Sequence, residues 1–331
     1  MTLRIRTLLP AINPKILKFL VKRSLLSLIT LGILSVVVFL GGQLLPGDVG
    51  RAVLGPLADA RAVAVFNHQV GVDRPLLVQY WDWITHFLAG DMGRSFTFRE
   101  PVAPFIAEAL TNSLKLAALA FVLVVPLGIA GGVWAALRVG RLSDRGMVLL
   151  GQSLGVVPEF ISSIVLILIF GVWLRWLPMS ADWPPGAGPL TQIRYLILPS
   201  LPLVLVFFGY IARVARVGTI EALDADYTRT AILKGLSMPA VMRRHVLRNA
   251  LLPTITVVAS LVGYLAGGLV VIETLFHYRG IGALIYAAAR TKDFPMLEAG
   301  VLTVGVIYAL ASVLADLLSA ALNPRMRAES A

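Results

Sequence analysis

One acidic side chain interrupts a long apolar stretch of this sequence. Glu159 lies inside the apolar run Met147–Trp173, directly after Pro158. A charge within an apolar helix is costly and marks either a pathway or a structural pair, and a proline can kink the helix that contains it. Two interpretations stay open. Glu159 lines a translocation pathway and meets a cationic group of the cargo, or it is a structural group that is paired with a neighbouring helix or neutral.

A second acidic residue lies near the end of the last apolar run. We predict that Asp316 forms a structural ion pair with Arg213 or Arg216, which we place at the same depth in a neighbouring run. Such a pair would neutralise both charges at the edge of an apolar region.

Signatures of catalysis are missing from the chain. It has no Gly-Lys-Ser/Thr phosphate loop and no His-Glu-x-x-His motif. It has no cysteine, which excludes a thiolate metal site, and its histidines lie in different loops: His68, His86, His245 and His277. We therefore predict a chain that is not an enzyme and has no catalytic, cofactor-binding or metal-binding residue of its own.

The composition is that of a membrane protein. The 331 residues are 58% hydrophobic and 14% charged, whereas about a quarter of a soluble domain is charged. Runs of about 20 apolar residues can cross a bilayer as helices. The sequence predicts an all-α integral membrane protein with six spans, which are Ser24–Leu45, Leu114–Leu137, Met147–Trp173, Tyr195–Val217, Leu251–Ile272 and Ala299–Leu322.

The loops between these runs differ in positive charge. One set of segments, which consists of the two tails and the loops 138–146 and 213–250, holds 18 Lys/Arg and 5 Asp/Glu. The other set holds 10 Lys/Arg and 11 Asp/Glu and consists of the loops 41–113, 174–194 and 273–298. Because basic loops stay on the cytoplasmic side, we predict that both termini are cytoplasmic. The asymmetry also accounts for the net charge of +11 without a nucleic-acid partner.

Five segments follow from these boundaries. They are a cytoplasmic tail (1–23), a first span (24–45), an external loop with an amphipathic helix (46–113), a core of five spans (114–322) with a cytoplasmic loop at 221–250, and a cytoplasmic tail (323–331).

The external loop shows helical periodicity. Pro75 follows Asp73, which suits a helix start, and apolar and aromatic residues then recur at helical spacing up to Leu88, before Gly90. Two interpretations are open for this helix: it lies on the membrane surface, or it packs within a small external subdomain.

The cytoplasmic loop 224–250 is the most polar segment between two spans. Asp226 can cap a helix over Tyr227–Lys234, and Gly235 suits its end. Ser237 can cap a second helix that leads into the fifth span. A short helix with a tyrosine and an alanine stripe can dock in a groove of a soluble partner. The alternative is a solvated basic loop that only sets the topology.

This loop resembles the EAA loop of ABC-importer permeases, whose general form is Glu-Ala-Ala, three residues, Gly, nine residues, Ile-x-Leu-Pro. Arg229-Thr230-Ala231 stands at Glu-Ala-Ala, Gly235 at the glycine, and His245-Val246-Leu247-Arg248 at Ile-x-Leu-Pro, with departures at Arg229 and Arg248. Further stretches resemble the B-type permease subunit of the dipeptide/oligopeptide/nickel branch: LLPGD (44–48), GVDRPLLVQYWDW (71–83), GDMGRSF (90–96) and VIETLFHYRGIGALI (271–285).

The resemblance implies a permease subunit with the type I importer fold in the bacterial inner membrane. It implies a second, related permease, two cytoplasmic ATPases that hold ATP and magnesium, and an extracytoplasmic solute-binding protein. The loop 224–250 would couple to an ATPase, through residues that include Tyr227, Arg229, Thr230, Ala231, Lys234, Gly235 and Leu247.

The cargo implied by this branch is short peptides, with nickel chelates, glutathione, sugars or opines as alternatives. An ion-coupled secondary transporter is an alternative class. It would need titratable groups or broken helices within the membrane, and Glu159 is the acidic residue nearest the middle of a predicted span.

Overall fold

The computed structural model describes residues 14–44, 49–55, 57–71, 73–266 and 269–322. The regular secondary structure within these ranges is helical, and Arg94 and Pro101 form an isolated bridge. The long elements are α1 (Pro14–Leu44), α5 (Val102–Ala136), α6 (Leu142–Val156), α8 (Pro189–Asp224), α11 (Leu247–Ala266) and α14 (Phe294–Leu322). The short ones are α2 (Val49–Leu54), α3 (Ala60–Val70), α4 (Leu76–Leu88), α7 (Glu159–Leu166), α9 (Asp226–Leu233), α10 (Met238–Val241), α12 (Val270–Leu275), α13 (Ile281–Thr291) and the π-helical turns η1 (Ile167–Trp173) and η2 (Met242–Val246). The predicted all-α fold class is confirmed.

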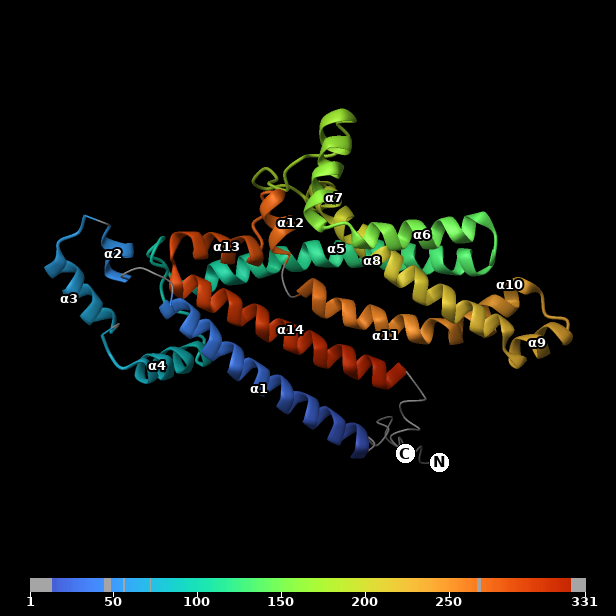
Figure 1. Ribbon diagram of the computed structural model, residues 1–331, viewed down its shortest axis with the longest axis horizontal. Coiled ribbons are helices and arrows are strands. Elements are labelled where there is room, and N and C mark those ends of the chain that lie inside the picture. The colour runs from blue at the N-terminus through green and yellow to red at the C-terminus, as the bar shows by residue number, and fades with distance from the viewer. Residues whose placement is uncertain (1–13, 45–48, 56, 72, 267–268, 323–331) are drawn as a thin grey trace, which may run out of the picture.

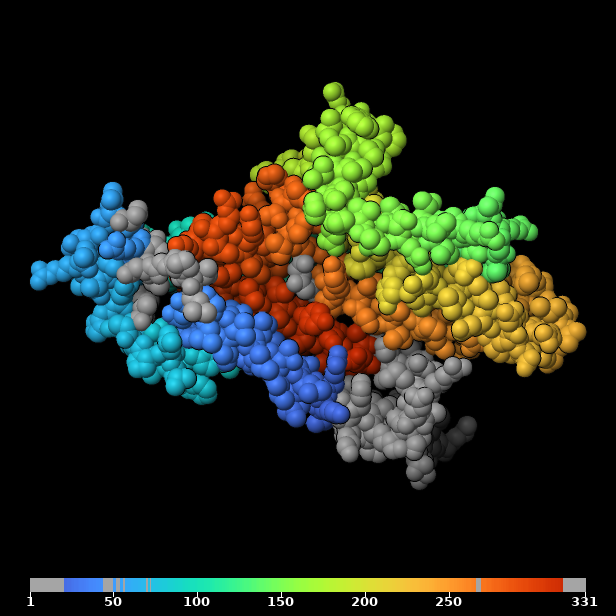
Figure 2. Space-filling model, in the orientation of Figure 1, coloured from blue at the N-terminus to red at the C-terminus, as the bar shows by residue number. Residues whose placement is uncertain are grey.

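The described helices include five that are long and apolar enough to cross a membrane, or six if a bent pair counts as one span. They form an elongated bundle with α9 and α10 at one end, which we call the hairpin end (Figure 1). The elements α3, α4 and α13 lie toward the opposite end, which we call the distal end (Figures 1 and 2).

Helices α5 and α8 form the centre of the bundle and approach each other through glycine. A methyl group added at Gly132 would lie 2.3 Å from the carbonyl oxygen of Ala212, and one at Gly209 of α8 would lie 2.0 Å from that of Gly151 on α6. These positions therefore require glycine. Gly128 and Gly132 are four residues apart, so they share one face of α5, and that face meets α8.

The second span begins earlier than predicted. The sequence predicted it over Leu114–Leu137, whereas α5 begins at Val102. Its first turns are held by burial, because Val102 and Ile106 pack in an apolar cluster with Ile281 of α13 and Met296 of α14. Tertiary packing at the distal end therefore extends the helix through the more polar residues that precede the apolar run.

The predicted third span is not one straight helix. The axes of α6 and the α7–η1 segment differ by 105°, and α7–η1 stands away from the bundle in Figure 1. The break lies at Val157, which is extended, and Pro158, which precedes the first turn of α7. Proline disfavours a helical conformation in the residue before it, so the predicted kink at Pro158 is instead a corner.

The predicted fifth span, Leu251–Ile272, is also divided. Helix α11 begins at Leu247 and ends at Ala266, and a separate short helix, α12, begins at Val270. Residues 267 and 268 between them lie outside the described part of the chain. The apolar run alone could not separate these two elements, because both are apolar.

Helix α4, predicted in the loop after the first span, packs on the distal part of α1. The Ser35 and Tyr80 hydroxyls are 2.8 Å apart, and Gln43 donates a hydrogen bond to Gln79 at 3.1 Å. The Phe39 ring lies edge-on to Tyr80 with the centroids 5.5 Å apart. Helix α4 has no fully buried residue, so it lies on the side of α1 as an exposed amphipathic element.

Candidate functional site

The first candidate site is a short hairpin at one end of the bundle, which we call the docking hairpin (α9, α10 and η2, residues 226–246). Helix α9 follows α8 after a single extended residue, Ala225, with φ −71° and ψ 147°. At its end, Gly235 has φ +81° and donates to the carbonyl of Ile232 at 2.9 Å. The predicted glycine stop is thus confirmed, since this conformation favours glycine.

The predicted cap of this helix is wrong in detail. Asp226 is the first helical residue, Ala225 occupies the cap position, and no side chain makes a capping hydrogen bond there. A carboxylate in the first turn still interacts favourably with the helix dipole. Ser237 lies at the predicted cap position of the second helix, again without a capping bond from its side chain.

The base of the docking hairpin is an apolar cluster. Its buried members are small or β-branched: Ala222, Ala231, Val241, Val246 and Ala250. Ala231 is 4% exposed, so the structure corrects its expected role as a contact for a partner. Thr228, which sequence reasoning missed, is buried and donates a hydrogen bond to the carbonyl of Ala222 at 2.6 Å. That bond ties α9 back to the end of α8.

The opposite face of the hairpin exposes large apolar side chains. Leu233 is 81% exposed, and Tyr227, Ile232 and Met238 are between 40% and 52% exposed. Water-exposed apolar side chains that are grouped on a small element typify a site for a protein partner. Sequence reasoning had selected Tyr227 but not the other three, although Ile232 and Leu233 follow directly after the buried Ala231.

The remaining predicted coupling residues divide by exposure. Arg229, Thr230, Lys234 and Gly235 are exposed, whereas Leu247, the first residue of α11, is partly buried. Basic side chains beside an exposed apolar patch suit an acidic rim on a partner. The hairpin therefore presents an apolar centre with cations next to it.

The docking hairpin is joined rigidly to two long helices. A methyl group at Gly218 of α8 would lie 2.4 Å from the carbonyl oxygen of Ala250 on α11, so the two helices are in backbone contact directly above the hairpin. Interiors packed this closely transmit displacements. A force on α9 would therefore move α8 and α11 together.

Arg216 of α8 is paired, but with a partner that was not predicted. Its guanidinium donates to both carboxylate oxygens of Asp144 on α6, at 2.5 and 2.7 Å, and the Gly140 N–H adds a third bond at 3.0 Å. Asp144 is buried, and bidentate arginine pairs of this kind are strong. This pair fixes the start of α6 to α8.

The predicted partners of Asp316 are therefore wrong. Asp316 forms an ion pair with Arg23 of α1, 2.6 Å from Nε to Oδ2, and Arg23 also donates to Ser312 at 3.0 Å. The pair joins the early part of α1 to the late part of α14. The neighbour of Asp316 is thus α1 rather than α8.

Glu159 lies at the corner between α6 and α7, in the first turn of α7 directly after Pro158. Its Oε1 accepts a hydrogen bond from the Tyr264 hydroxyl of α11 at 3.2 Å. The Tyr264 ring in turn lies edge-on to Phe207 of α8. Glu159 thus touches a neighbouring helix. Both the pathway and the structural hypothesis for this residue stay predictions.

Two buried carboxylates hold the distal end together. Asp293 accepts hydrogen bonds from the Ser95 hydroxyl and from the N–H groups of Phe96 and Thr97, both at 3.1 Å. It precedes α14 directly, so it fixes the loop of residues 90–99 to the start of that helix. This clamp was not predicted, because it joins segments almost two hundred residues apart in sequence.

Glu273 of α12 is the second buried carboxylate. It accepts hydrogen bonds from the Ser113 hydroxyl of α5 and from the Ala283 N–H in the first turn of α13, the latter at 3.0 Å. It lies so close to Gly280 that an added methyl group there would be 2.1 Å from its Cδ. Burial raises the pKa of Glu273 above its ordinary value, while these hydrogen bonds oppose the shift.

Comparisons with known proteins agree with this geometry. Residues 128–328 match the family model described as the inner membrane component of binding-protein-dependent transport systems, and residues 16–118 match the model of its N-terminal part. The glutathione transport system permease protein GsiC of Salmonella typhimurium (strain LT2) is 38% identical over 317 residues, covering 94% of this chain and 99% of the relative. The protein of the same name from Escherichia coli (strain K12) is 36% identical over 313 residues, with the same coverage.

Proposed function

Since this chain belongs to the family of inner-membrane components of binding-protein-dependent transport systems, and is a multi-pass inner-membrane permease subunit of an ABC transporter, we propose that it imports short peptides. Glutathione, itself a tripeptide, is the first cargo to test, because the relatives are named for its transport. Peptides are also the cargo expected for the branch that the sequence motifs resemble.

In the proposed assembly, this chain works with several other proteins. A second, related permease completes the pathway, and an extracytoplasmic binding protein delivers the peptide. Two ATPases supply ATP and magnesium on the cytoplasmic side. The excess of basic residues in 213–250 supports a cytoplasmic location for the docking hairpin.

The observation that carries the proposed coupling role is the exposed apolar face of the docking hairpin. Leu233 is 81% exposed, while the cluster beneath it fixes α9 to α8 and α11. An ATPase that binds this face would move both helices, because they are in backbone contact at Gly218 and Ala250.

Uptake by a reconstituted complex tests the transport proposal. Proteoliposomes that contain both permeases and both ATPases, supplied with the binding protein, should accumulate labelled glutathione only when ATP is present on the ATPase side. Accumulation that is independent of ATP, or no accumulation of glutathione or of any dipeptide tested, would contradict it.

A single substitution tests the docking face. Leu233→Asp should reduce ATPase binding and ATP-driven uptake by about tenfold or more, because central apolar contacts dominate protein interfaces. The matched control is Leu57→Asp, which changes a leucine that is 98% exposed between α2 and α3. Equal uptake by the two variants would remove the docking role from this face.

A further inference from the structure

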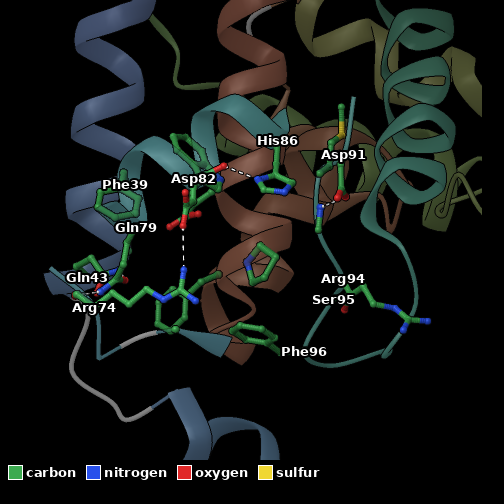
Figure 3. A pocket seen from close by; sticks show the side chains of 18 of the residues that line it. Phe39, Gln43, Arg74, Gln79, Asp82, His86, Asp91, Arg94, Ser95 and Phe96 are labelled. Atoms are coloured by element: carbon green, nitrogen blue, oxygen red, sulfur yellow. Dashed lines mark hydrogen bonds and ion pairs between the residues drawn. The ribbon is translucent and has the colours of Figure 1, made fainter. Parts of the chain in front are cut away.

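A cavity of about 760 Å³ lies at the distal end, apart from the docking hairpin (Figure 3). Its lining residues come from the end of α1, from α2 and α3 (Leu54 and Phe66), from the segment from Gly71 through α4, from the loop of residues 90–99, and from the start of α14. Small-molecule sites have volumes of about 300–1,000 Å³. We call it the distal cavity.

The lining combines aromatic rings with a few charged groups, as such sites do. The rings belong to Phe39, Phe66, Trp83, Phe96 and Phe294. The charged side chains are three arginines and three carboxylates: Arg74, Arg94, Arg99, Asp82, Asp91 and Glu298. With histidine neutral, these charges balance. The cavity therefore suits a ligand that carries both signs of charge and has no large net charge.

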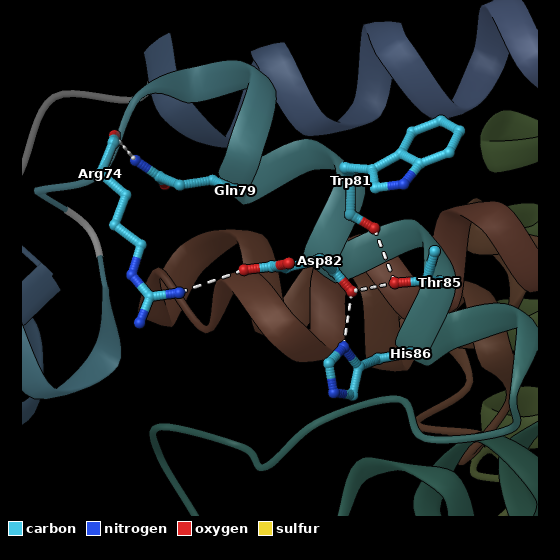
Figure 4. A network of polar contacts seen from close by, with 6 residues as sticks. All are labelled: Arg74, Gln79, Trp81, Asp82, Thr85 and His86. Atoms are coloured by element: carbon cyan, nitrogen blue, oxygen red, sulfur yellow. Dashed lines mark hydrogen bonds and ion pairs between the residues drawn. The ribbon is translucent and has the colours of Figure 1, made fainter.

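Two of the three carboxylates already have partners. Arg74 reaches across to Asp82 with 3.2 Å between the guanidinium and the carboxylate (Figures 3 and 4). Asp91 accepts a hydrogen bond from the N–H of Gly93 at 3.0 Å. The backbone carbonyl of Asp82 also accepts a hydrogen bond from the ring of His86 (Figure 4).

Glu298 differs from the other two carboxylates. The residue is 8% exposed and lines the cavity, and it has no hydrogen bond or ion pair with any other residue that the structure describes. Its carboxylate lies against α1 at a position without a side chain, since a methyl group at Gly42 would be 2.5 Å from Oε1. A buried carboxylate without a partner is costly. A cation that enters the cavity would remove that cost.

Among the described lining residues, no cationic side chain pairs with the Glu298 carboxylate. Arg74 is bound to Asp82, and Figure 3 shows Arg94 directed away from that pair. Arg94 and Arg99 are exposed and form no ion pair with a described carboxylate. They stay free to attract an anionic group on the same ligand.

We propose that the distal cavity is a peptide site, in which Glu298 binds the free amino terminus and the aromatic rings contact a side chain. The arginines favour a ligand whose carboxylate balances its ammonium group, which selects a peptide over a simple amine. The assignment of peptides rests on the proposed function, whereas the requirement for an ammonium group rests on Glu298.

Binding to the full permease complex in lipid nanodiscs, without ATP or binding protein, tests this site. The probe is labelled alanylphenylalanine, compared with its N-acetyl form, which has no ammonium group. The native complex should bind the free peptide about tenfold or more tightly than the acetylated one, because only the free ammonium group can form a charge-assisted hydrogen bond with Glu298.

Glu298→Gln should weaken binding of the free peptide about tenfold and leave binding of the acetylated peptide nearly unchanged. The matched control, Glu108→Gln, changes an exposed glutamate of α5 outside the cavity and should preserve the discrimination. If acetylation has no effect on the native complex, or the same effect with and without Glu298, the proposal is wrong. The acetylation comparison on the native complex needs no variant to fold.

Failure of this proposal differs from failure of the import function. If peptides are imported but acetylation and Glu298→Gln change nothing, the distal cavity is not their site. If the complex discriminates between the two peptides but imports neither, the cavity assignment stands and the import proposal fails.

Discussion

The hairpin end and the distal end of the bundle hold short helices against the long ones by different interactions. At the hairpin end, five small buried residues and the backbone contact of Gly218 with Ala250 provide the attachment. At the distal end, buried carboxylates bridge separate segments, with Glu273 between α5, α12 and α13 and Asp293 between the 90–99 loop and α14.

This difference has a physical consequence. The docking hairpin is held mainly by apolar packing and by the hydrogen bond from Thr228 to the carbonyl of Ala222, and neither involves an ionisable group. Directional bonds to buried carboxylates fix loops in one geometry, but they depend on protonation. The two ends therefore differ in what holds them, which is mainly apolar packing at the hairpin end and hydrogen bonds to buried carboxylates at the distal end.

A charge placed in the apolar base should have the largest effect. Ala231→Asp buries a carboxylate without a partner and should destabilise the hairpin by about 3–5 kcal/mol, seen as faster hydrogen exchange across residues 222–250. Thr230→Asp, at an exposed neighbour, is the control and should leave exchange nearly native. Equal protection in both variants would mean that the cluster does not hold the hairpin.

The carboxylate at the distal end should make stability depend on pH. Burial raises the folded-state pKa of Glu273 above its ordinary 4.5, so its contribution is fully present below the unfolded pKa and is lost as pH rises through the folded pKa. The slope cannot exceed about 1.4 kcal/mol per pH unit for one proton. Thermal unfolding in detergent should show this decline in the native chain, and Glu273→Gln should remove it. A decline of the same size in the variant would assign it to another group.

The smallest effect is expected for the pair between α1 and α14. Arg23 and Asp316 have side chains 43% and 30% exposed, and exposed ion pairs typically contribute about 0.2–1 kcal/mol. A double-mutant cycle of Arg23→Ala and Asp316→Ala, followed by thermal unfolding, should give a coupling in that range. A coupling of several kcal/mol would show that polar bonds are as important here as at the distal end.

The sequence was informative where the signals are local. The family prediction from the loop and the flanking motifs is confirmed by the family match. Helix α9 and its end at Gly235 follow from neighbouring residues alone. The six-span prediction holds if α6 with α7–η1 counts as one span.

Partners that are distant in sequence could not be predicted. Arg216 and Asp316 were placed at equal depth, but depth does not decide which helices are neighbours, and each pairs with a residue that was not considered. The direction in which Ala231 points depends on how α9 folds back on α8. Pro158 indicated a bend, while its angle of 105° depends on the packing around it.

A single residue, Ala225, connects α8 to α9. The hydrogen bond from Thr228 to the carbonyl of Ala222 spans this residue, so α9 is fixed to the end of α8, a helix of 36 residues. Such a helix is about 54 Å long, and a tilt of about 5° displaces its other end by about 5 Å. A small displacement at the hairpin end would therefore be enlarged at the far end of α8.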